Sequence, residues 1–65
     1  MNRKRITGRL EHTPRGFAVI TDAGERWILE DCAPDSALVG NDIIAEGVAS
    51  GLDRLRAAWI GSPAH

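Results

Sequence analysis

The sequence predicts a small all-β barrel formed by one domain, and three observations lead to this prediction. The chain has 65 residues, which is room for one core and no second lobe. Several short segments alternate apolar and polar side chains with a period of two, as strands with one buried face do. Glycine- and proline-containing turns separate these segments. We therefore expect a single domain over residues 1–65, with residues 1–4 and 61–65 as loose tails.

The first strand is predicted over residues 5–12, where apolar residues alternate with charged or polar ones. A turn follows at Thr13-Pro14-Arg15-Gly16, because proline presets the first central φ angle and glycine tolerates the positive φ that closes a hairpin. The second strand covers residues 17–21. Its apolar run leaves two inward sets open, either Phe17 with Val19 or Ala18 with Ile20.

A second hairpin turn at Asp22-Ala23-Gly24 leads into a third strand over residues 25–30. Alternation in this strand places Trp27 and Leu29 inward, and the neighbouring residues outward. The next stretch breaks the alternation. Residues 34–40 predict one short helical turn that starts near Pro34 and Asp35, stops at Gly40 and closes one end of the barrel with Leu38.

A final hairpin is predicted within residues 38–60. Ile43 and Ala45 form one apolar row, and Gly47 interrupts it where a sharply bent strand has no space for a side chain. The returning strand continues the alternation with an inward row of Leu55, Ala57 and Trp59. Gly8 and Gly47 are both interpreted as barrel-bend positions, whereas Gly16 and Gly24 are turn residues.

A three-strand meander, a helical turn and a two-strand hairpin match the order of the five-stranded, Greek-key OB barrel (oligonucleotide/oligosaccharide-binding). An SH3-like barrel is the alternative, but its short turn usually comes before the last strand. The segments GRL, GERWIL, LVGNDIIAEGV, GLDRL and WI also resemble a family of short, uncharacterised bacterial proteins with an OB-like barrel. That resemblance implies a fold and carries no catalytic motif.

Charge and composition limit the possible functions. The net charge is −1, so the chain lacks the overall positive charge of a strongly basic nucleic-acid-binding domain, and any such site has to be local. The single cysteine, Cys32, cannot form an internal disulfide. No apolar run follows the basic MNRKR start, and none is long enough to cross a membrane. We therefore expect a cytoplasmic protein without a membrane partner.

The sequence contains no pattern typical of an enzyme or a metal site. Cys32, His12 and His65 lack paired metal-ligand spacing. The acidic residues stand at turns or at solvent-facing strand positions, and the glycines form no phosphate-binding loop. We expect no catalytic residue, no metal and no cofactor.

Surface recognition remains, and arginines are its best candidates. With the fifth strand beside the third, outward Arg26, Arg54 and Arg56 share one face, and Arg15 and His12 lie on the loop between the first two strands. Such a face could hold single-stranded nucleic acid. The alternative is that these arginines only form ion pairs at the rim, with Asp22, Glu30 or Asp53 as partners.

A protein-binding or self-associating module is the competing class of function. Three isoleucines are predicted to face outward and could form an apolar patch on the barrel: Ile28, Ile44 and Ile60. A salt-sensitive interaction with an oligonucleotide would favour the first class, and a concentration-dependent mass would favour the second.

Overall fold

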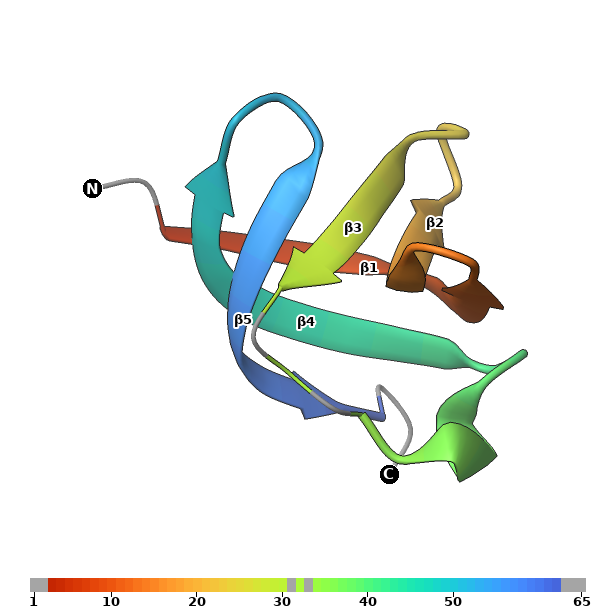
Figure 1. The fold of residues 1–65 in the computed structure, drawn as a ribbon. Coiled ribbons are helices and arrows are strands. Elements are labelled where there is room, and N and C mark those ends of the chain that lie inside the picture. Colours follow the sequence, from red (N-terminus) through yellow and green to blue (C-terminus); the bar gives the residue numbers. More distant parts are fainter. Residues whose placement is uncertain (1–2, 31, 33, 63–65) are drawn as a thin grey trace.

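The computed structural model describes residues 3–30, 32 and 34–62, and within them the chain is a closed all-β barrel (Figure 1). Among these residues, no helix has the length and apolar character needed to cross a membrane. The predicted five strands and the helical turn between the third and fourth are confirmed. The elements are β1 (Arg3–Thr13), β2 (Gly16–Thr21), β3 (Arg26–Glu30), the 3-10 turn η1 (Ser36–Leu38), β4 (Asp42–Ser50) and β5 (Arg54–Gly61).

The strands follow the order β1-β2-β3-β5-β4, and β4 pairs back onto β1 to close the barrel. All pairings are antiparallel except that of β3 with β5, which is parallel. This parallel seam joins Ile28–Glu30 to Arg54–Arg56. It is extended by a backbone hydrogen bond of 2.7 Å that the Ile28 amide donates to the Asp53 carbonyl. The predicted neighbourhood of the third and fifth strands is thus confirmed.

The core lies inside the barrel and contains one inward row from each strand. Trp27 and Leu29 are buried in it, as the alternation predicted. In β2, Ala18 and Val19 are both completely buried, but Val19 belongs to the core cluster and Phe17 packs against it, so the inward set is Phe17 with Val19. The buried core residues are Ile6, Leu10, Val19, Trp27, Leu29, Ile43, Ala45 and Leu55.

The helical turn forms as its sequence predicts. Asp35 precedes it, and its carboxylate accepts a 3.0 Å hydrogen bond from the Ala37 amide. Gly40 follows with a φ of 89°, a conformation that favours glycine. Leu38 packs against the core from this turn, so the turn covers one end of the barrel.

At Gly8 and Gly47, which the sequence predicts as barrel-bend positions, two strands approach too closely for a side chain. A Cβ atom at Gly8 would collide with the carbonyl of Ile20 on β2. One at Gly47 would collide with the carbonyl of Arg56 on β5. Both obstacles are backbone atoms, so only a movement of the strands could relieve the clash.

The prediction that Trp59 faces inward is wrong, and a β-bulge is the reason. Glu46 pairs with Trp59 and the next residue, Gly47, pairs with Ala57, so Ala58 is an extra residue on β5. The extra residue reverses the alternation beyond it. Trp59 is consequently 50% exposed, whereas Ile60, predicted to face outward, packs against the core.

The first and last strands are longer than predicted. Arg3 and Lys4, predicted as part of a loose tail, belong to β1 and pair with β4. Gly61 belongs to β5 and pairs with Ile44. The remainder of the predicted tails, residues 1–2 and 63–65, lies outside the described residues.

Candidate functional site

The structure brings two of the predicted arginines to one surface hollow. Arg15, from the turn between β1 and β2, and Arg54, at the start of β5, both line it. Ile28, Leu29 and Glu30 of β3 contribute the rest of the lining. The turn reaches this place because the β2–β3 register sets its base beside the end of β3. The hollow therefore joins side chains that are far apart in the sequence, as the predicted face required.

The ion-pair alternative holds for one of these arginines. Arg54 Nη1 donates to Glu30 Oε2 at 3.3 Å, with both side chains partly open to solvent. An exposed pair of this kind contributes about 0–1 kcal/mol, so a phosphate could replace the carboxylate at small cost. Arg15 is exposed and, among the described residues, has no ion-pair partner. The hollow thus holds two guanidinium groups and one carboxylate.

Arg26 and Arg56 lie on the same outward side of the β3–β5 pair. Arg56 is in register with Glu30, the ion-pair partner of Arg54, and Arg26 lies on β3 one outward position before Ile28. Both are exposed, although neither lines the hollow itself. They extend its positive charge along the seam in both directions.

His12 does not share this face. Its ring stacks on Phe17, with 4.7 Å between the ring centroids and 23° between the ring planes. His12 is in register with Phe17 and has the same parity as buried Leu10, although its side chain is exposed at the end of the barrel. The alternation over residues 5–12 already places His12 on the same side of the strand as Leu10, and the assignment of His12 to the loop did not use this pattern.

Trp59 is the surface residue that the sequence prediction missed. It lies on β5 in register with Glu46, whose carboxylate accepts a 2.7 Å hydrogen bond from Arg5 Nε. The next outward row contains Val48 of β4, flanked by Arg3 and Arg56. We call these residues the β1–β4–β5 face: Arg3, Arg5, Glu46, Val48, Arg56 and Trp59. It meets the predicted arginine face at Arg56.

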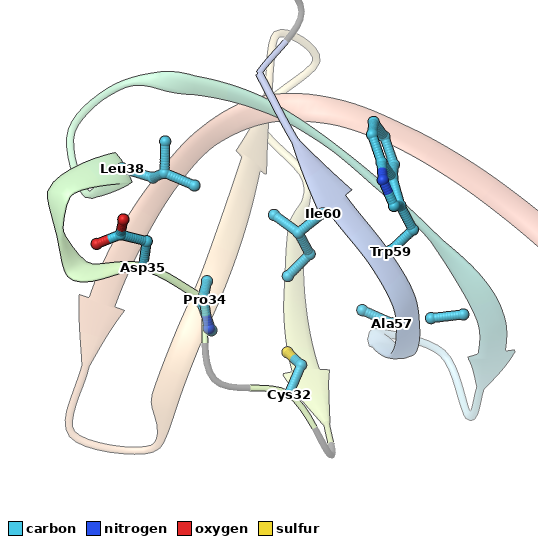
Figure 2. A pocket seen from close by; sticks show the side chains of 8 residues that line it. Cys32, Pro34, Asp35, Leu38, Ala57, Trp59 and Ile60 are labelled. Carbon is cyan, nitrogen blue, oxygen red and sulfur yellow. The ribbon is translucent and has the colours of Figure 1, made fainter.

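A second hollow lies between the β3–β4 connection and β5 (Figure 2). Cys32 and Leu38 border it, and both pack against the core, where a cysteine acts as a small apolar side chain. Figure 2 shows Ile60 and Trp59 on opposite sides of β5, and both side chains contribute to the lining of this hollow. Trp59 belongs to the β1–β4–β5 face through its register with Glu46.

The three isoleucines predicted to form an outward patch do not form one. Ile28, Ile44 and Ile60 are each half-buried. The large apolar residues that are exposed among the described residues are Val39, Leu52 and Trp59. Val39 follows η1, whereas Leu52 is in the β4–β5 turn, so they belong to opposite ends of β4.

Comparison with known proteins assigns a family but no activity. Nothing among the curated proteins or the solved structures matches the chain. The model of one family, described as "Protein of unknown function (DUF5818)", matches residues 7–63. These residues include β2, β3, β4, β5 and most of β1, so the match spans the barrel described above. The chain therefore belongs to the DUF5818 family.

Proposed function

We propose that the protein is a non-enzymatic module that binds single-stranded nucleic acid on the outward face of β3 and β5. The observation that carries this proposal is the joint lining of one hollow by Arg15 and Arg54. Guanidinium groups bind phosphate through several hydrogen bonds. Arg26 and Arg56 then contact phosphates of the nucleic-acid strand on either side of the hollow.

The topology supports the same proposal. A five-stranded barrel in which β3 lies beside β5, with a helical turn between β3 and β4, has the arrangement of an OB barrel. Such barrels hold oligonucleotides on the β2–β3 face and on the loops between strands one and two and strands four and five. Arg15 is on the first of these loops, and Arg54 follows the second. We place the module in the bacterial cytoplasm, where its single cysteine stays reduced.

Binding at this site is expected to be weak and strongly dependent on salt. The net charge of −1 gives no long-range attraction for a polyanion, so affinity comes from the local arginines. Each phosphate contact to a single strand contributes about 0.7 to the slope of log affinity against log salt. The two arginines of the hollow thus contribute about 1.4 to this slope, and binding is best detected at low salt.

The test is fluorescence anisotropy with a labelled single-stranded oligonucleotide of mixed sequence, at low and then physiological salt. Replacing Arg15 and Arg54 together by Ala should weaken binding and reduce the salt slope by about 1.4. Arg9→Ala is the matched control, because Arg9 is also an exposed arginine. It lies on β1, in register with Ile20 of β2, and β2 separates it from β3.

If the double variant and the native protein bind the oligonucleotide with equal affinity, this hollow is not part of the binding site. Absence of binding by the native protein at low salt would refute the function itself. A mass that rises with protein concentration would then support the alternative, a self-associating module, and can be measured by sedimentation on the same samples.

A further inference from the structure

We propose that Trp59 is a base-stacking platform that extends the nucleic-acid site from the β3–β5 seam onto the β1–β4–β5 face. This inference rests on the proposed function and adds what the arginines lack, a contact with the bases themselves. An exposed aromatic ring beside cationic side chains is the combination with which proteins hold single strands without reading their sequence.

The bulge at Ala58 and the glycine at position 61 together orient the ring. Because Ala58 is an extra residue, the Trp59 side chain is on the outside of the barrel. The indole then lies against the backbone of Gly61: its Cζ2, Cη2 and Cε2 atoms are 2.5, 2.6 and 3.3 Å from the position that a Cβ atom at Gly61 would occupy. Half of the side chain remains open to solvent. The ring is therefore supported on one side and accessible on the other.

The charge around the ring suits a nucleic-acid strand. Glu46, the register partner of Trp59, is neutralised by its 2.7 Å bond to Arg5. Arg3 is exposed and, within the described part of the chain, has no ion-pair partner. With Arg56 in the same row, the β1–β4–β5 face carries three arginines against one carboxylate. A base on the indole would thus have cationic groups nearby for its phosphates.

The two faces are close enough to hold one strand. Arg54 and Trp59 are both on β5, and the five residue steps between them span roughly 16 Å. Arg56 lies between them and belongs to both faces. An oligonucleotide that covers the roughly 4–16 nucleotides usual for one such barrel could contact the hollow and the indole together.

The experiment separates base stacking from phosphate binding. The protein is titrated at low salt with an oligothymidylate and with an abasic phosphodiester chain of the same length. The second ligand offers phosphates without bases. Trp59 is the exposed tryptophan and Trp27 is buried, so quenching of the solvent-exposed emission reports on Trp59. We expect the oligothymidylate to quench this emission and to bind about 5- to 10-fold more tightly than the abasic chain, as one stacked base would give.

Trp59→Leu should abolish the difference between the two ligands and leave the affinity for the abasic chain unchanged. Trp59→Phe, which keeps a smaller ring, should retain part of the difference. Val39→Ala is the matched control, because Val39 is an exposed apolar residue that follows η1, outside both faces and outside the β4–β5 loop. It should behave as the native protein does.

The outcomes distinguish the inference from the proposed function. If the native protein binds both ligands equally, or if Trp59→Leu keeps the preference for bases, the stacking platform is refuted and the arginine site stands. If the Arg15 and Arg54 double variant loses both ligands to the same extent, the arginine site is supported independently. If neither ligand binds the native protein, both proposals are refuted.

Discussion

The two tryptophans of this chain have the same chemistry and opposite surroundings. Trp27, on β3, is 9% exposed and belongs to the core, whereas Trp59, on β5, is 50% exposed and lies on the outer surface. Both occur in strands, and alternation along the sequence predicts an inward position for both. The difference is the single extra residue, Ala58, in β5. A bulge can thus turn a residue that local pattern assigns to the core into part of a surface.

The surroundings of the two rings differ accordingly. The Lys4 ammonium lies over the Trp27 ring, 5.3 Å from its centroid, at one end of the barrel. The Trp27 indole N–H is buried and, among the described residues, lacks a hydrogen-bond partner. Trp27 therefore stabilises the fold through its apolar surface, despite an unsatisfied donor. Trp59 contacts the backbone of Gly61 and contributes little to the core.

The largest expected effect is that of Trp27→Ala. Removing a buried aromatic ring costs about 3–5 kcal/mol, and a domain of this size has roughly 3–10 kcal/mol of stability in total. We expect urea unfolding, followed by circular dichroism, to show a largely unfolded protein at 25 °C. Trp27→Phe should cost clearly less, because it keeps most of the ring and removes the unsatisfied N–H. A stable Trp27→Ala protein would mean that the core does not depend on this ring.

Gly47→Ala tests the backbone geometry that accompanies the bulge. The new Cβ would meet the Arg56 carbonyl, so β4 and β5 would have to separate. We expect a loss of about 1–3 kcal/mol in the free energy of unfolding, measured by urea denaturation. Ser50→Ala, an exposed position on the same strand, should change it by less than about 0.5 kcal/mol. A neutral Gly47→Ala would show that the two strands are further apart at this point.

The smallest expected effect is that of Trp59→Ala. Because half of the side chain is already in water, its loss should lower the free energy of unfolding by about 1 kcal/mol. The same urea experiment, now with Trp27 emission as the probe, gives this value. A loss as large as that of Trp27→Ala would place Trp59 in the core and contradict the bulge.

Most of the fold could be predicted from local sequence patterns. Alternation gave the strands and the inward positions of Trp27 and Leu29, and the turn glycines gave the hairpins, because these signals depend on neighbours in the chain. The position of Arg15 beside Arg54 also followed, since the order of elements predicted that β3 and β5 are adjacent. Whether this hollow binds nucleic acid remains a prediction.

The orientation of Trp59 could not be predicted in the same way. The run from Ala57 to Ile60 is apolar throughout, so either Trp59 or Ile60 could follow Ala57 on the inward side. Which of them does so depends on the register between β4 and β5, where Gly47 lets the two backbones approach closely. The pairing of β5 with β4 therefore determines which of the two residues faces inward. Alternation within one strand carries no information about this pairing.

The parallel seam between β3 and β5 has a consequence for how the protein is made. β5 pairs with both β3 and β4, so the barrel cannot close until the residues up to Gly61 have been synthesised. Until then, β3 has one unpaired edge while β1 and β2 can already form a hairpin. The contacts that close the barrel join distant parts of the chain. We therefore expect the pairing of β5 with β3 and β4 to limit the rate of folding. Variants in the seam should therefore slow folding more than variants in the β1–β2 turn do.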